Sequence, residues 1–181
     1  LASRGDWARG SGMVDDLVIH LGDLKTGSTS IQEALIAKAW RAEGVRLVYP
    51  TKFNHIPLAR TLYAPGEAKH RDARFRRLRK RIAEAEADVA VISAEHFEHV
   101  APEALRDALE RHLPDLAGRA RLIAYVRPHA ERLVSSYAEM VKVGSFAGPI
   151  RVLHRRSLEK GRFRYAPRFR RWREAFRDRF E

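Results

Sequence analysis

The chain has 181 residues, no cysteine, a formal net charge of +12 and a hydrophobic fraction of 45%. This length and composition predict one globular domain with a sizeable core, and they exclude disulfides and a cysteine-based zinc site. No apolar run approaches the ~18 residues that a transmembrane segment needs, so we expect none. Because a protein without cysteine fits a reducing compartment, we expect a cytoplasmic location.

The positive charge is concentrated in two stretches. Residues 69–82 hold eight Lys or Arg and one Asp, and residues 151–181 hold twelve Arg or Lys and four acidic residues. Such an excess suits a polyanionic partner, namely nucleic acid, an anionic membrane surface, a sulfated or phosphorylated ligand, or a nucleotide. Solvated helix faces give the same pattern. Since no aromatic-interleaved basic motif of a nucleic-acid-binding domain occurs, we expect no nucleic-acid partner.

The first third of the chain predicts two strands and one helix. Residues 1–12 are polar and lack an apolar signal segment, so we expect a disordered extension or remnant ahead of Met13 and one domain over 13–181. An apolar run predicts a strand at 17–21, and a periodic pattern predicts a helix at 28–42. A second strand is expected at 45–49. Residues 50–66 carry several prolines and predict a loop with room for one helical turn.

The rest of the chain alternates helices and strands. Helices are expected at 68–86, 102–113 and 128–143, and buried strands at 88–93 and 121–126. A last amphipathic helix is expected to carry one aromatic stripe, formed by Phe169, Trp172, Phe176 and Phe180. This alternation predicts an α/β fold whose parallel sheet is flanked by helices on both faces.

The most informative stretch joins the first strand to the first helix. It contains Gly22 and Gly27, which permit close backbone approach, and Lys25 between them. Backbone N–H groups at a helix start, together with hydroxyls and a lysine, form a cradle for a phosphate. The lysine precedes the second glycine, so the order is not the G-x-x-x-x-G-K-[ST] of nucleotide-hydrolase P-loops.

The order Lys-Thr-Gly-Ser-Thr-Ser resembles the 5′-phosphosulfate loop of sulfotransferases that use 3′-phosphoadenosine 5′-phosphosulfate (PAPS). The resemblance implies a three-layer, P-loop-like parallel sheet and PAPS as the cofactor, with no metal. Lys25 would also be catalytic, by stabilising the leaving phosphate oxygen. The residues that would hold the 5′ end of the cofactor are Lys25, Thr26, Gly27, Ser28, Thr29 and Ser30.

A second stretch, which begins at Arg127, resembles the 3′-phosphate motif of the same family, Arg-x-Pro-x-x-Arg-x-x-Ser. Arg127 and Ser135 match in type and spacing and would grip the 3′-phosphate. The proline is displaced, because Pro128 follows the arginine directly and His129 stands in the usual proline position. Similar Arg-Pro forms occur among bacterial members of the family.

Sulfuryl transfer also needs a base for the attacking hydroxyl, and sulfotransferases use His or Glu. Glu95 follows the strand at 88–93, near where the resemblance places this base, and is the first choice; His96 is the second. His20 and His55 are weaker candidates, and His20 is expected to be a core histidine. In parallel sheets ligands sit outside the carboxyl ends of the strands. Lys25, Glu95 with His96, and Arg127 are therefore expected to face one crevice.

The sequence thus predicts a PAPS-dependent sulfotransferase acting on a hydroxyl or amine of a small molecule, glycan or lipid. Two alternatives stay open: a P-loop-type nucleotide kinase, and a non-enzymatic basic nucleic-acid-binding domain. A homo-oligomer stays open too. Sulfotransferases of this type usually run longer, so we expect a C-terminally incomplete domain whose acceptor pocket is open on one side.

Overall fold

A computed structural model describes residues 14–39 and 44–181. Within these residues the strands are β1 (Asp16–His20), β2 (Leu47–Val48), β3 (Val89–Ser93) and β4 (Ala120–Ile123). They form one parallel sheet in the order β2-β3-β1-β4. The expected α/β class with a parallel sheet is therefore confirmed. The expected extension at 1–12 and Met13 lie outside the described residues. The first helix, expected over 28–42, ends at Ile36, because Ala37 caps it and Lys38 adopts a left-handed φ of 53°.

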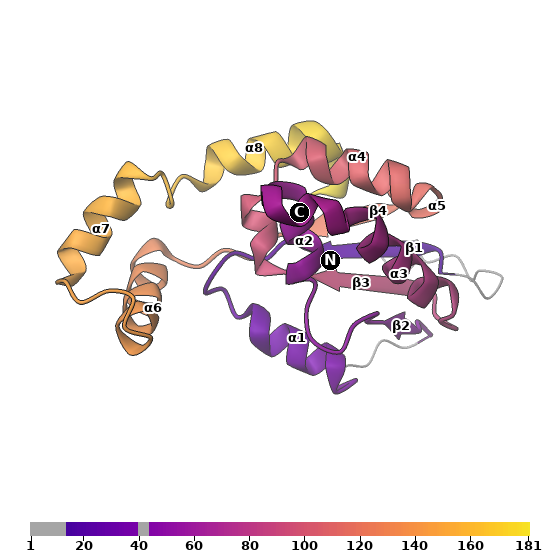
Figure 1. Ribbon diagram of the computed structural model, residues 1–181, viewed down its shortest axis with the longest axis horizontal. Coiled ribbons are helices and arrows are strands. Elements are labelled where there is room, and N and C mark those ends of the chain that lie inside the picture. Colours follow the sequence, from indigo (N-terminus) through magenta and orange to yellow (C-terminus); the bar gives the residue numbers. More distant parts are fainter. Residues whose placement is uncertain (1–13, 40–43) are drawn as a thin grey trace.

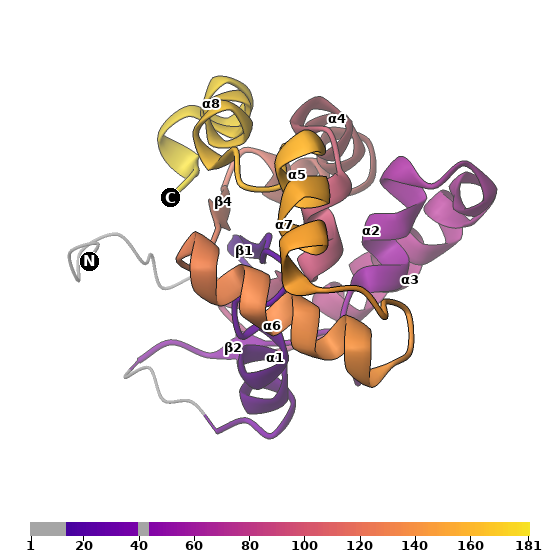
Figure 2. The same ribbon diagram turned by 90° about the vertical axis from the view of Figure 1, so that its left-hand side faces the viewer.

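Helices cover both faces of this sheet and its carboxyl end. Figure 1 shows α1 (Ser28–Ile36) below the sheet and α4 (Pro102–His112) and α8 (Tyr165–Phe176) above it. The helices α6 (His129–Lys142) and α7 (Ile150–Glu159) lie beyond the carboxyl ends of the strands, and α6 crosses in front of the sheet in Figure 2. The other helical elements are α2 (Ile56–Tyr63), α3 (Arg71–Ala83), α5 (Pro114–Ala117) and the 3-10 turns η1 (Pro65–His70), η2 (Glu95–His99) and η3 (Arg177–Arg179).

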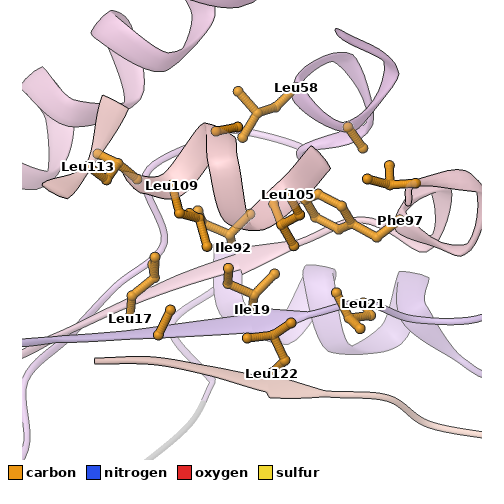
Figure 3. Packing of buried hydrophobic residues seen from close by; sticks show 14 of the residues in the cluster. Leu17, Ile19, Leu21, Leu58, Ile92, Phe97, Leu105, Leu109, Leu113 and Leu122 are labelled. Atoms are coloured by element: carbon orange, nitrogen blue, oxygen red, sulfur yellow. The ribbon is translucent and has the colours of Figure 1, made fainter. Parts of the chain in front are cut away.

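The dry core lies on the α4 face of the sheet. Leu17 and Ile19 of β1 point to this face and are completely buried. Leu105 and Leu109, one helical turn apart on α4, pack over them (Figure 3). The opposite face is polar near the strand ends, because the buried side chains of α1 are Ser28 and Gln32. One face therefore stabilises the fold, while the other carries polar groups at the end where the loops meet.

The C-terminal aromatic stripe joins this same core. Trp172 and Phe176 stack with ring centroids 5.8 Å apart and are nearly fully buried. The helix ends at Phe176, because Arg177 adopts a left-handed φ of 56°, so Phe180 reaches the stripe from outside the helix. Glu181 then extends the β4 edge, where its N–H donates to Leu122 O at 2.9 Å. Three residues of the stripe are buried and Phe169 is partly buried, while the expected placement of Phe180 on the helix is wrong.

Three other expectations needed correction. Residues 50–66 contain the full helix α2, because Pro57 fits its first turn and Leu58, Ala59 and Leu62 are buried on one face. The helix α7 was not expected, since its apolar stripe is interrupted by arginines. The fourth strand ends at Ile123 instead of residue 126, because its partner β1 ends at His20 and turns into the glycine loop. No helix in the described part of the chain is long and apolar enough to cross a membrane.

Candidate functional site

The loop between β1 and α1 packs directly against the segment after β3. Gly22 has a φ of +62°, and a Cβ built there would lie 2.8 Å from the Cα of Glu95. Only glycine fits such a close approach with a left-handed backbone. Gly27, with a φ of +91°, forms the N-cap of α1 and turns the chain into the helix. The two glycines therefore set the shape of the loop around Lys25.

Ser28 begins α1 and is buried, with 6% of its surface exposed. Among the described residues its Oγ has no hydrogen-bond partner. A buried polar atom without a partner is uncommon in folded proteins, and an oxyanion placed beside this hydroxyl would supply one. The first N–H groups of α1 have no partners within the helix either, and the helix dipole gives this end a partial positive charge. The start of α1 is therefore suited to an anion.

The start of α1, including Ser28, lines one cavity of about 340 Å³ at the carboxyl end of the sheet. A neighbouring open hollow of about 490 Å³ lies along α6 and shares Arg127 and Ser135 with the cavity. Of the residues expected at the site, the cavity lining contains Lys25, Gly27, Ser28, Thr29, Glu95, Arg127 and Ser135. Leu24 and Glu139 complete it, while the lining formed by the described residues does not include Thr26, Ser30 or His96.

Lys25 and Arg127, which are in direct contact, both bring positive charge to the cavity. Lys25 has a left-handed φ of 70°, which is uncommon for a residue with a side chain. Its carbonyl accepts a hydrogen bond of 3.2 Å from Arg127 Nη1, across 102 residues of sequence. The Lys25 ammonium pairs with the Glu139 carboxylate, and Arg127 Nε donates to Glu131 at 3.1 Å. Sequence reasoning missed Glu139, since it lies on α6 well beyond the stretch from Arg127 to Ser135 and belongs to no short motif.

The carboxylate of Glu95 is held by α1. Gln32 Nε2 donates to Glu95 Oε2 at 3.2 Å and to Ser93 Oγ at 3.1 Å. Ser93 Oγ also bonds His20 Nδ1 at 2.8 Å. His20 is 3% exposed, and burial lowers its pKa, although the Glu95 charge acts in the opposite direction. The expectation that His20 is a core histidine is confirmed, and a buried polar chain leads from it to Glu95.

The other two histidines point elsewhere. His96 lies on η2, where its Nδ1 bonds Tyr63 Oη at 2.7 Å and its ring lies 5.7 Å from that of His99. His55 precedes α2, and its Nδ1 accepts a hydrogen bond of 3.1 Å from the Ser93 N–H. Burial lowers the pKa of His55 to about 4. Glu95 is thus the candidate base that the fold places on the cavity.

A buried ionic cluster supports the loop from behind. Asp23 Oδ2 accepts hydrogen bonds from Arg132 Nη1 at 3.2 Å and Arg168 Nη2 at 2.6 Å. Glu98 Oε1 accepts one from Arg132 Nη2 at 2.6 Å, and Glu98 Oε2 accepts one from the Leu24 N–H at 3.1 Å. The cluster joins the loop, η2, α6 and α8. Sequence reasoning missed it, because Asp23 and its arginine partners are more than a hundred residues apart.

The charges of this cluster influence one another. Burial, and next the negative charge of Glu98, raise the pKa of Asp23 to about 6, although both arginines oppose this. Burial acts to raise the pKa of Glu98 too, but the charge of Arg132 and the Leu24 N–H outweigh it, so that pKa is lowered. Glu98 therefore carries the more firmly held negative charge.

No family model, curated protein or solved structure matches this chain. Within residues 14–39 and 44–181, no group of three or more His, Asp or Glu side chains is placed to hold a metal ion.

Proposed function

We propose that the chain is a PAPS-dependent sulfotransferase, which transfers a sulfuryl group to a hydroxyl or amine of a small-molecule, glycan or lipid acceptor. The observation that carries the proposal is the convergence of Lys25, Arg127 and Ser135 on one cavity, in the order that the resemblance implies. A three-layer, P-loop-like sheet and a cytoplasmic location belong to the same proposal.

The residues present fit an anionic nucleotide. Ser28 Oγ, which has no partner among the described residues, would gain one from an oxyanion at the start of α1. Lys25 would exchange its ion pair with Glu139 for one with the anion, so Glu139 would leave the ammonium as the nucleotide enters. The hollow shared by Arg127 and Ser135 continues the cavity along α6, which gives room for a ligand with phosphates at both ends.

The roles of the side chains follow from their positions. PAPS, when bound, supplies an activated sulfuryl group, whose transfer leaves negative charge on a phosphate oxygen. Lys25 and the N-terminus of α1 stabilise that charge, and Ser28 and Thr29 add hydroxyl donors. Arg127 and Ser135 hold the 3′-phosphate. The Thr26 hydroxyl donates to Asp23 O at 2.7 Å, so Thr26 shapes the loop, while Ser30 adds a backbone N–H in the first turn.

Glu95 acts as the base in this proposal. Its carboxylate lines the cavity, where it would accept the proton of the acceptor hydroxyl as the new oxygen–sulfur bond forms. Gln32 fixes the carboxylate through a hydrogen bond of 3.2 Å. His96 would need to leave Tyr63 to do the same, so it is the second candidate.

The two alternatives have weaker support. A kinase needs a carboxylate free to bind Mg²⁺, whereas Asp23, the acidic residue of the loop, is bound to Arg132 and Arg168. A nucleic-acid-binding domain would rest on net charge alone. The cavity lining also includes the carboxylates Glu95 and Glu139, which would repel a phosphate backbone.

The decisive experiment is calorimetry with adenosine 3′,5′-bisphosphate in EDTA, followed by a screen of acceptors with labelled PAPS. We expect metal-independent binding that Ser28→Ala weakens, while Ser136→Ala, a matched change on α6 outside the lining, leaves it unchanged. ATP binding that requires Mg²⁺ would support the kinase instead. If neither adenosine 3′,5′-bisphosphate nor ATP binds, the proposal is wrong.

A further inference from the structure

A second basic pocket lies at the β2 side of the sheet. It has a volume of about 170 Å³ and is enclosed by the segment between β2 and α2 on one side and by α3 on the other. Arg74, Arg77 and Arg81 line it. Their spacing of three and four residues places them on one face of α3, so three guanidinium groups border the same small space.

Two of these arginines are held by hydrogen bonds to backbone carbonyls, which do not neutralise the positive charge. Arg81 Nη1 donates to Pro50 O at 3.1 Å, and Arg74 donates to Pro57 O. Glu67 pairs with Arg74 at 2.7 Å. No other carboxylate among the described residues forms an ion pair with any of the three arginines. Arg77 forms no ion pair within the described part of the chain. The pocket therefore has a net positive charge, and the guanidinium groups of Arg74 and Arg81 are already oriented.

His55 adds a neutral donor to the same pocket. Its Nδ1 accepts from the Ser93 N–H, so the proton of the neutral ring is on Nε2. The residue is 5% exposed, and within the described chain its Nε2 has no hydrogen-bond partner. Because burial lowers the pKa of His55 to about 4, the ring stays neutral at physiological pH. A buried N–H beside three arginines lacks an acceptor, and an oxyanion would supply it.

The pocket is joined to the candidate base through Ser93. The Ser93 N–H donates to His55, while Gln32 Nε2 donates both to the Ser93 hydroxyl and to the Glu95 carboxylate. His55 N also donates to Ser93 O at 2.9 Å, so His55 occupies the edge of β3 beyond the end of β2. Only Ser93 and Gln32 separate His55 from Glu95 in this network, so an anionic group held beside His55 would lie near the candidate base.

We infer that this pocket binds an oxyanion group, such as a sulfate, phosphate or carboxylate, that the acceptor carries. The acceptor is then an acidic molecule rather than a neutral one. That the bound molecule is the acceptor rests on the proposed function. The anion site itself rests only on the pocket residues Arg74, Arg77, Arg81 and His55.

The test is calorimetry with inorganic sulfate on the full chain, after saturation with adenosine 3′,5′-bisphosphate so that the first site is filled. We expect Arg77→Ala to weaken sulfate binding at least 10-fold. Lys80→Ala removes one charge from the same helix, and because Lys80 pairs with Glu84 away from the pocket, it should bind sulfate as the unaltered chain does. Thermal denaturation checks that Arg77→Ala is folded, which we expect because Arg77 holds no ion pair in the described chain.

Glucose 6-sulfate and glucose separate a free anion from one carried by a sugar-sized molecule. We expect glucose 6-sulfate to bind with the same dependence on Arg77, and glucose not to bind. If inorganic sulfate binds but glucose 6-sulfate does not, the inference that the acceptor carries the anion is wrong. If Arg77→Ala binds sulfate as tightly as the unaltered chain, the anion is not bound in this pocket. If the bisphosphate does not bind but sulfate binding depends on Arg77, the proposed function fails while the anion site stands.

Discussion

Arg132 donates to Asp23 across 109 residues of sequence, with Nη1 3.2 Å from Oδ2. Arg132 is the second arginine of the stretch that begins at Arg127, yet it turns away from the cavity and is 4% exposed. Its Nη2 reaches Glu98 Oε1 at 2.6 Å. The two arginines of one motif thus have different tasks, since Arg127 faces the cavity and Arg132 holds the loop that carries Lys25.

The first prediction concerns this buried pair. Arg132→Met should lower the free energy of unfolding by about 3–5 kcal/mol, because it leaves Asp23 and Glu98 buried with less compensating charge. Urea denaturation measures the change. Arg171→Met is the control, since its ion pair with Glu103 is exposed on both sides and contributes little. Equal losses in the two variants would contradict a structural role for Arg132.

The second prediction is a pH dependence of stability. Because the pKa of Asp23 is raised to about 6, the folded chain keeps a proton that the unfolded chain releases above its ordinary value of 3.8. The contribution of Asp23 to stability therefore falls as the pH rises from about 4 to about 6, by at most ~1.4 kcal/mol per pH unit, and is constant above that.

Asp23→Asn should remove this slope. Urea denaturation of both proteins at several pH values between about 4.5 and 7 gives the difference between them. We expect that difference to change most below pH 6. Glu98, whose pKa is lowered, contributes stability that is lost only as the pH falls through that lower pKa. A difference that stays constant with pH would show that Asp23 is ionised throughout the range.

The third prediction is that Lys25→Ala reduces transfer from PAPS by about 10²–10³-fold while the chain stays folded, because a preorganised charge near the leaving oxygen is lost. Turnover with labelled PAPS and the midpoint of thermal unfolding measure the two effects. Lys69→Ala, a charge change on the exposed surface of η1, should have neither. Near-normal turnover of Lys25→Ala would remove Lys25 from the site.

The fourth prediction separates the two ends of the nucleotide. Arg127→Ala and Ser135→Ala should weaken binding of adenosine 3′,5′-bisphosphate at least tenfold, about 1.4 kcal/mol, and that of adenosine 5′-monophosphate far less. The reason is that both residues are proposed to contact only the 3′-phosphate. Calorimetry with the two ligands is the measurement, and Ser136→Ala is the control. Equal losses for both ligands would refute the assignment.

The fifth prediction ranks the candidate bases. Glu95→Gln should reduce turnover by about 10²–10⁴-fold with little change in nucleotide affinity, because a base acts on the acceptor. His96→Ala should keep most of the activity, since His96 bonds Tyr63 outside the cavity lining drawn from the described residues. Steady-state kinetics with calorimetry distinguishes the two. An active Glu95→Gln beside an inactive His96→Ala would reverse the ranking.

The sequence by itself determined the class of fold and the position of the glycine-containing loop between β1 and α1. Apolar runs such as residues 17–21 and 88–93 fix buried parallel strands, because periodicity and β propensity are local properties. The glycines at 22 and 27 and the lysine between them mark the loop for the same reason. Boundaries were less secure, since β4 ends where its neighbour β1 turns away, and α2 forms where prolines suggested a loop.

Only the tertiary structure decided which side chains contact one another at the site. It brings Arg127 to the carbonyl of Lys25, places Glu139 against the Lys25 ammonium and turns His96 towards Tyr63. It also buries Arg132 against Asp23 and leaves Ser28 Oγ without a partner in the described chain. The physical reason is that these contacts join segments far apart in the sequence, so they depend on how the loops, η2 and α6 pack at the carboxyl end of the sheet. No local pattern encodes such packing.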